Sequence, residues 1–167
     1  MRYSETSESL RENKDFQIVY RRGRSAANRA LVIYAYPRAE EMRKFQAKID
    51  AVKAAEDSGK PSEDGKTEQA EEVRKEKAAA KLRMPHSWKM AGYEKNRVGI
   101  SVSKKGGNSV VRHHLCRLIR ESYRKNEDRF VGGLDMVVIA RPGARELSFS
   151  DIDRALLSVS RRLGVSR

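Results

Sequence analysis

Apolar and polar residues alternate between residues 97 and 103, and this alternation predicts a β-strand with one buried face. The apolar positions are Val98, Ile100 and Val102, and the positions that alternate with them are Arg97, Gly99, Ser101 and Ser103. The second face of this strand is therefore predicted to be small and polar.

A strongly two-faced helix is predicted to follow, beginning near Ser109. Gly106 and Gly107 break the alternation because glycine permits backbone conformations that other residues avoid, and Asn108 is a suitable N-cap. At about 100° per residue, one helix face consists of Val111, Leu115, Leu118, Ile119 and Ser122. The opposite face consists of His113, Arg117, Arg120 and Arg124, with Arg112 and Cys116 on a flank. Because the apolar face must pack on the protein, the cationic face is predicted to point outward.

The cationic face favours an anionic polymer as its partner, although an arginine-rich helix can also be a plain solvated surface. Lys104 and Lys105 precede the helix N-terminus, whose free N–H groups attract anions. No Asp or Glu occurs between residues 97 and 120. Arginines one turn apart are about 5–6 Å from each other, a spacing that suits a row of phosphates.

The other apolar patterns predict further helices and strands. Residues 13–22 have helical spacing, and residues 24–37 are predicted to be extended. The nearly continuous apolar run at 134–140 is typical of an interior strand. A capping box of Ser150 and Asp153 is predicted to open a last amphipathic helix.

Three aromatic residues have two interpretations on sequence alone. Phe16 and Tyr20 are one helical turn apart, and Tyr34 lies in the extended segment. These rings either pack in the core or form a stacking platform for unpaired bases.

Residues 39–95 differ from the rest in charge. The chain has 36 Lys and Arg against 23 Asp and Glu, a net charge of +13, whereas residues 39–95 hold 13 basic and 12 acidic residues. Spacings of three and four predict a helix, from Met42, Phe45, Ile49 and Val52. A second, weaker helix between residues 68 and 84 would complete a helical hairpin. A largely disordered loop is the alternative, because this second part is poor in large apolar residues.

Composition limits the compartment, the membrane association and the metal sites that the sequence allows. The chain has no apolar run of 18 residues and no signal-peptide pattern, so we expect a cytoplasmic protein without a membrane partner. The single cysteine, Cys116, fits a reducing compartment. His113, His114 and Cys116 have no second ligand pair elsewhere, so no metal site in the protein is predicted.

The run SVSKKGGNSVVRHHLCRLIRE resembles the signature of the bacterial ribonuclease P protein subunit, SVSKK-x-GN-A-V-x-R-N-R-x-K-R-L-x-R-E. The segment NKDFQIVYRRGRSAANRALVIYAYP resembles the usual start of that family, and the ARPG at 140–143 also matches. The resemblance covers about 110 residues. Family members generally have a short loop where this chain has residues 39–95, so we interpret that segment as an insertion.

The resemblance implies an α+β fold, an αβββαβα two-layer sandwich with a four-stranded sheet and a left-handed βαβ crossover, as in the ribosomal protein S5 domain 2-like class. The pattern of elements agrees with that order. Residues 1–12 are expected to be a flexible tail, and residues 13–167 a single RNA-binding domain interrupted by the insertion at 39–95.

The resemblance also implies a function, the removal of 5′ leaders from precursor tRNA by an endoribonuclease in which a catalytic RNA performs the hydrolysis. Mg²⁺ would be held mainly by the RNA subunit and the substrate, with no catalytic residue in the protein. The expected partners are ribonuclease P RNA and precursor tRNA, without an obligate protein partner. The implied contacts with the catalytic RNA are Lys104, Lys105, Asn108, Arg112, His113, His114, Arg117 and Arg120. The implied leader-binding cleft consists of Phe16, Tyr20, Tyr34, Ser101 and Ser103.

This sequence departs from the family signature in the helix. The usual Arg-Asn-Arg-x-Lys-Arg is Arg112-His113-His114-Leu115-Cys116-Arg117 here, so one arginine and one lysine are missing. Two other functions stay open at this point. One is a non-enzymatic RNA-binding or ribosome-associated protein, and the other is a nuclease that needs no RNA.

Overall fold

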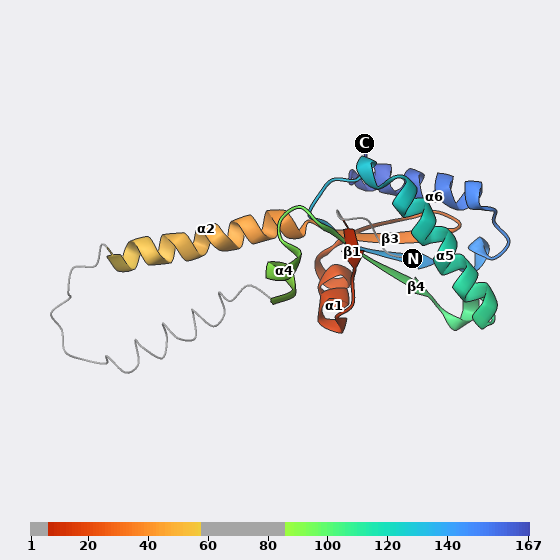
Figure 1. Ribbon diagram of the computed structural model, residues 1–167, viewed down its shortest axis with the longest axis horizontal. Coiled ribbons are helices and arrows are strands. Elements are labelled where there is room, and N and C mark those ends of the chain that lie inside the picture. Colours follow the sequence, from red (N-terminus) through yellow and green to blue (C-terminus); the bar gives the residue numbers. More distant parts are fainter. Residues whose placement is uncertain (1–6, 58–85) are drawn as a thin grey trace. The chain divides into compact units, whose positions relative to one another are not determined.

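The computed structural model describes residues 7–57 and 86–167 (Figure 1). The strands are β1 (Ser7–Ser9), β2 (Arg24–Ala27), β3 (Leu31–Tyr36), β4 (Asn96–Val102) and β5 (Asp135–Ala140). The helices are α1 (Asn13–Arg22), α2 (Arg38–Asp57), α4 (His86–Ala91), α5 (Ser109–Lys125) and α6 (Phe149–Leu163). Three short 3-10 helices are η1 (Lys104–Gly106), η2 (Glu127–Arg129) and η3 (Pro142–Ala144). The fold is therefore a mixed α+β fold, as expected.

The chain divides into two compact units. The first unit runs to Ala39 and resumes at Ala91, and the second unit is Glu40–Met90. The second unit thus lies within the segment that we interpreted as an insertion at 39–95.

The sheet of the first unit has five strands in the order β1-β4-β5-β3-β2. Strands β4 and β5 are parallel neighbours, so the chain crosses over between them through α5. The expectation of four strands was wrong, because Ser7–Ser9 pairs in parallel with Asn96–Val98. These residues had been placed in a flexible tail. A strand of three residues is too short to carry an alternation that sequence can reveal.

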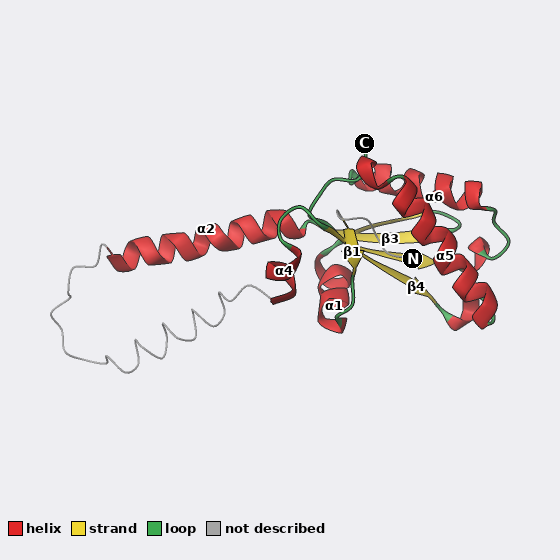
Figure 2. Ribbon diagram, in the orientation of Figure 1, coloured by secondary structure: helices red, strands yellow, loops and turns green. Residues whose placement is uncertain are grey.

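The two faces of the sheet are covered by different helices. Helices α5 and α6 pack together on one face (Figure 2), and the main core lies there. This core contains the predicted apolar residues of the strands and helices, among them Ile33, Val98, Leu115, Ile119 and Ile152. Helix α1 covers part of the other face, where it contacts β3 and β5.

The connection from β4 into α5 has the predicted geometry. Asn108 is extended, with φ −67° and ψ 176°, and its Oδ1 accepts a hydrogen bond from the Val111 backbone N–H at 3.0 Å. Gly107 has φ +129°, a conformation that strains any residue with a side chain. The glycine and the cap together let the chain pass from η1, which follows β4, into α5.

The start of α6 differs from the predicted one. The capping box is formed by Ser148 and Asp151, not by Ser150 and Asp153. Ser148 has the extended conformation of an N-cap, and Phe149 already begins the helix. Asp153 instead accepts hydrogen bonds from Ser122 at 2.7 Å and Asn126 at 2.8 Å, which join α6 to α5.

The second unit contains α2 from Glu40 onward and the short helix α4 as far as Met90. Within α2, Met42 is buried and Phe45 and Ile49 are half-buried, in agreement with the predicted apolar face. Helix α4 was not predicted, and its Trp88 is buried. The predicted second helix, between residues 68 and 84, lies outside the described residues.

Candidate nucleic-acid interface

The bend between β4 and α5 exposes two lysines. Lys104 and Lys105 lie in η1 and are both exposed, whereas Gly106 is buried. A Cβ at Gly106 would lie 3.1 Å from Cγ1 of Val102, which keeps the turn close to the end of β4. The lysines therefore stand just ahead of the positive N-terminal end of α5.

Helix α5 presents most of its predicted cationic face to solvent. His113, His114 and Arg117 are exposed, and Arg120 is half-buried. In the part of the chain that the structure describes, neither Arg117 nor Arg120 takes part in an ion pair. Arg124 pairs with Glu121 instead, with its Nε 3.2 Å from Oε2. The arginines of α5 that have no ion pair among the described residues, Arg112, Arg117 and Arg120, therefore all precede Arg124 in the helix.

The flank of α5 carries two arginines beside the cysteine. Burial raises the pKa of the Cys116 thiol, and the positive charges of Arg120 and Arg112 act against this rise. Nε of Arg112 is buried without a hydrogen-bond partner among the described residues. Arg112 is half-buried, as its predicted place on the flank implies, whereas Arg120 is less outward than the helical pattern predicts.

Three more cations, which sequence analysis missed, lie at the same edge of the sheet as the bend. Val102, Ala140 and Leu31 are register partners at the ends of β4, β5 and β3. The residues just beyond these ends include Arg29, Arg141 and Arg145, all exposed. A Cβ at Gly107 would lie 3.2 Å from Nη2 of Arg145, and Arg141 donates to the Asn28 carbonyl at 3.0 Å. The sequence could not have revealed these three arginines, because only the order and pairing of the strands bring them to the bend.

The three predicted aromatic residues come together on the face of the sheet that α1 covers. The ring centroids of Phe16 and Tyr20 are 6.4 Å apart, and those of Tyr20 and Tyr34 are 5.1 Å apart with the rings at 87°. Tyr20 is 40% exposed and the other two rings are half-buried, whereas Val19 and Asp15 of α1 are buried. Burial, and next the neighbouring Tyr34, raises the pKa of Tyr20. A partly open aromatic surface is the result.

Phe16 sits directly on the backbone of β4. A Cβ at Gly99 would lie only 2.6 Å from both Cε1 and Cζ of the Phe16 ring. Gly99, Val137 and Tyr34 are register partners across β4, β5 and β3. The absence of a side chain at Gly99 therefore leaves room for the Phe16 ring on β4, in the same cross-strand row as Tyr34.

The predicted serines take different places. Ser101 is half-buried and lies one row beyond Gly99 on the same strand face, where Ile139, Val32 and Ala27 continue the row. Ser103 is exposed but lies past the end of β4, next to η1. Ser101 therefore belongs with the aromatic surface, and Ser103 with the lysines of the bend.

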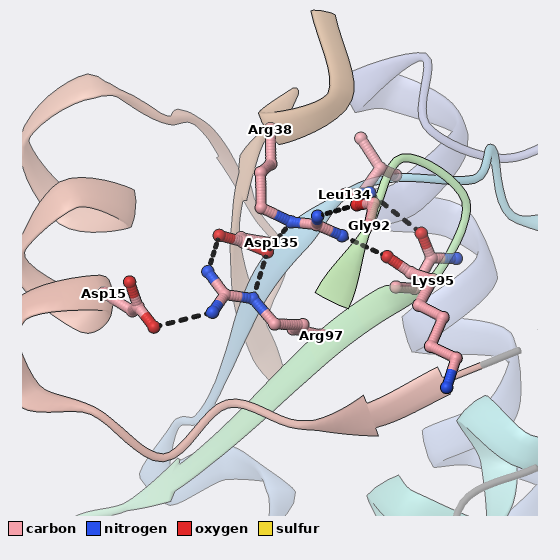
Figure 3. A network of polar contacts seen from close by, with 8 residues as sticks. Asp15, Arg38, Gly92, Lys95, Arg97, Leu134 and Asp135 are labelled. Atoms are coloured by element: carbon pink, nitrogen blue, oxygen red, sulfur yellow. Dashed lines mark hydrogen bonds and ion pairs between the residues drawn. The ribbon is translucent and has the colours of Figure 1, made fainter. Parts of the chain in front are cut away.

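A buried charge network lies at the other end of this strand face (Figure 3). Arg97 is 3% exposed and donates from Nη1 to Asp15 at 2.7 Å and from Nε to Asp135 at 2.8 Å. Arg38 donates from Nε to the same Asp135 oxygen at 2.8 Å and from its Nη atoms to the carbonyls of Gly92 and Lys95. The expectation of a single buried face on β4 was wrong at Arg97, which is buried on the second face because two carboxylates distant in sequence converge on it.

The two arginines respond differently to burial. Burial lowers the pKa of Arg38, against the opposing effect of Asp135. Burial also acts to lower the pKa of Arg97, but the hydrogen bonds and charges of Asp135 and Asp15 outweigh it, and the pKa is raised. Arg97 is thus the more fully compensated charge.

Two general properties concern metal binding and membranes. Among residues 7–57 and 86–167, no three His, Cys, Asp or Glu side chains are grouped so that they could hold a metal ion. None of the helices described is both long and apolar enough to cross a membrane.

Comparison with known proteins gives a consistent result. A family model described as Ribonuclease P matches residues 67–164. The chain is 30% identical over 159 residues to a protein of Alkaliphilus metalliredigens named "Ribonuclease P protein component". The match covers 95% of this chain and 96% of that protein. The corresponding protein of Clostridium perfringens is 32% identical over 157 residues, 94% of this chain and 89% of its own length. The Lachnoclostridium phytofermentans protein is 54% identical over 66 residues, which are 40% of this chain and 57% of that protein.

Solved structures show the same fold. The RNase P protein of Staphylococcus aureus has a TM-score of 0.60 at 24% identity, covering 98% of this chain and all of that chain. The RNase P protein of Thermotoga maritima has a TM-score of 0.55 at 21% identity, covering 92% and 96% of the two chains.

Proposed function

This chain belongs to the ribonuclease P protein family, and we propose that it binds ribonuclease P RNA through the bend after β4 and the outward face of α5. As a protein component of ribonuclease P it takes part in an endoribonuclease ribonucleoprotein. What the proposal adds is the assignment of contacts to particular side chains.

The observation that carries the proposal is the run of exposed cations along η1 and α5. Lys104 and Lys105 precede the N-terminus of α5, and Arg117 is exposed on it without an ion pair among the described residues. Phosphate contacts from such cations supply affinity without reading sequence. Asn108 holds the bend, and Arg112, His113, His114 and Arg120 add further donors on the helix.

The cations at the sheet edge extend the same surface. Nη2 of Arg145 lies close to Gly107, and Arg29 and Arg141 are exposed beside it. Their position next to the bend supports a larger phosphate-binding area than α5 alone would offer.

The aromatic surface is proposed to hold the single-stranded 5′ leader of precursor tRNA. Phe16, Tyr20 and Tyr34 offer ring faces and edges that stack on unpaired bases, at about 1–3 kcal/mol per base. Ser101 lies beside them as a hydrogen-bonding group, whereas the position of Ser103 favours a contact with RNA at the bend.

The chemistry of cleavage is proposed to belong to the RNA, with Mg²⁺ held mainly by the RNA and the substrate. The described residues of both surfaces are cationic, neutral or aromatic, and they do not fit a Mg²⁺ site, which is built from oxygen ligands of carboxylates and phosphates. The protein neutralises phosphates and positions the leader, and no step of hydrolysis is assigned to its side chains.

A reconstitution assay tests this function. Precursor tRNA and Mg²⁺ would be incubated with the purified protein alone, with ribonuclease P RNA alone, and with both. We expect cleavage at the mature 5′ end to be faster with both than with RNA alone, and absent with protein alone. Cleavage by the protein alone would indicate a protein nuclease. RNA binding without any stimulation would indicate a plain RNA-binding protein.

A further inference from the structure

Arg97 joins helix α1 to the sheet through two buried carboxylates. Its guanidinium donates to Asp15 at 2.7 Å and, through Nε and Nη2, to both oxygens of Asp135 (Figure 3). The side chains of Asp15, Arg97 and Asp135 are 2%, 4% and 1% exposed. A single residue of β4 therefore connects the first turn of α1 with the start of β5.

This connection lies next to the aromatic surface. Asp15 immediately precedes Phe16, and the ring of Phe16 is seated on Gly99, two residues after Arg97 on the same face of β4. Strand β4 thus supplies both Arg97, which holds α1 through Asp15, and Gly99, on which the Phe16 ring lies. If the anchor moves, the ring must move with the helix that carries it.

We propose that Arg97 is a positioning residue for leader recognition, which sets Phe16 on Gly99 by holding Asp15 in place against Asp135. The inference rests on the proposed leader-binding role of the aromatic surface. Arg97 itself is buried and touches no RNA, so its effect is transmitted through α1.

The planar guanidinium is what this role requires. Arginine presents donors in a fixed fork that can bind two carboxylates at once, whereas the ammonium of lysine is a single point charge on a flexible stem. Arg97→Lys keeps the charge but cannot reproduce both contacts. It should therefore loosen α1 without leaving an uncompensated carboxylate pair.

Arg38 offers a matched control for the loss of a buried arginine. It is fully buried and binds the same Asp135 oxygen, and it also donates to the carbonyls of Gly92 and Lys95. Arg97 donates to Asp15 as well as to Asp135. Arg38→Lys should thus lower the melting temperature while α1 keeps its anchor.

The experiment compares wild type, Arg97→Lys and Arg38→Lys, each reconstituted with ribonuclease P RNA. The first measurement is the ratio of the affinities for precursor tRNA and mature tRNA. The second is the NMR shift of the Gly99 Hα protons in the free protein, which the Phe16 ring displaces. We expect Arg97→Lys to lower the affinity ratio by about fivefold or more and to remove the ring-current shift, and Arg38→Lys to preserve both.

Two results would overturn the inference. One is an unchanged affinity ratio and shift in Arg97→Lys, and the other is an equal change of both in Arg38→Lys. If Arg97→Lys does not fold, Asp15→Asn takes its place in the same two measurements. This variant keeps the shape of the side chain and weakens its contact with Arg97.

Phe16→Ala separates this inference from the proposed function. If Phe16→Ala lowers the affinity ratio and Arg97→Lys does not, the leader surface stands and the role of Arg97 is refuted. If Phe16→Ala leaves the ratio unchanged, the leader assignment is refuted. The Gly99 shift then still decides whether Arg97 positions the ring.

Discussion

Gly99 is a residue whose missing side chain shapes the proposed leader surface. A methyl group here would lie 2.6 Å from two carbons of the Phe16 ring, closer than side-chain carbons come in folded proteins. The backbone at this position is ordinary β-strand, so the requirement for glycine comes from the ring above it and not from backbone strain.

Gly99→Ala should therefore displace Phe16. We expect weaker binding of precursor tRNA relative to mature tRNA and a loss of about 1–3 kcal/mol in the free energy of unfolding, because the strand face becomes overpacked. Urea denaturation and the two tRNA affinities measure these effects. In a Phe16→Ala background both effects should largely vanish. Equal effects in the two backgrounds would show that the ring is not the obstacle.

The paired histidines of α5 belong to the proposed RNA interface. His113 and His114 are exposed beside the arginines of the helix, at positions where the family signature has asparagine and arginine. The N–H groups of an imidazole ring can donate hydrogen bonds to phosphate oxygens. The double variant His113→Ala and His114→Ala should therefore bind ribonuclease P RNA more weakly than the wild type.

Binding titrations at one pH and one salt concentration check this expectation, and thermal denaturation should show little change. Unchanged affinity in the double variant would remove both histidines from the RNA interface.

At the scale of elements, α5 divides its two faces between folding and binding. Leu115 and Ile119 are buried in the core that α5 shares with α6, and the arginines on the opposite side contribute little to that core. Because the cations belong to a helix fixed by packing, they are held in place before RNA arrives. Their removal should affect RNA binding much more than stability.

Arg117→Ala combined with Arg120→Ala should weaken binding of ribonuclease P RNA. Each lost phosphate contact lowers the slope of log affinity against log salt by about 0.7–0.9, so the slope should fall by roughly 1.4–1.8. Binding at several salt concentrations measures this change, and thermal denaturation should show little change.

A matched control removes the same charge from another helix. Arg154 and Arg161 are exposed on α6, so Arg154→Ala with Arg161→Ala changes the net charge equally. This control should change the salt slope little. A similar slope change in both pairs would mean that only net charge matters.

At the scale of the whole molecule, the sequence was informative wherever a pattern repeats within one element. The period of α5, its N-cap at Asn108 and the alternation of β4 were all readable, since each depends on neighbours in the chain. The burial of Arg97 could not be read from the sequence, because its partners Asp15 and Asp135 lie 82 and 38 residues away. Arg29 and Arg145 were missed for the same reason, since only the sheet order brings them to the bend. The hand of the β4-α5-β5 crossover stays a prediction from the family resemblance.

The junction of the Glu40–Met90 unit also depends on contacts distant in sequence. Arg38 lies just before this unit in the sequence, and Gly92 and Lys95 lie just after it. Arg38 binds the backbone carbonyls of Gly92 and Lys95 and also the side chain of Asp135. The backbone N–H of Ala39 donates to Gly133 at 2.9 Å, and that of Gly133 donates to Glu94 at 2.9 Å. The first unit therefore fixes both of the chain segments between which the second unit is inserted.

Replacing residues 40–90 with a short Gly-Ser linker should leave the first unit folded and its affinity for ribonuclease P RNA unchanged. The unit comprises 51 residues, and the cost of closing a loop rises by only about 0.6 kcal/mol per doubling of its length. Shortening the connection to about six residues, roughly three halvings, should thus change the free energy of unfolding by roughly 2 kcal/mol. Circular dichroism, urea denaturation and RNA titration measure the result.

The junction itself should matter far more than the unit that it carries. In the shortened chain, Arg38→Met leaves Asp135 with one arginine and removes the donor from two backbone carbonyls. Losing one partner of a buried ion pair typically costs about 3–5 kcal/mol.

Unfolding of the shortened chain with Arg38 intact would show that Glu40–Met90 belongs to the folding core. Loss of RNA affinity without unfolding would place part of the RNA interface within that unit.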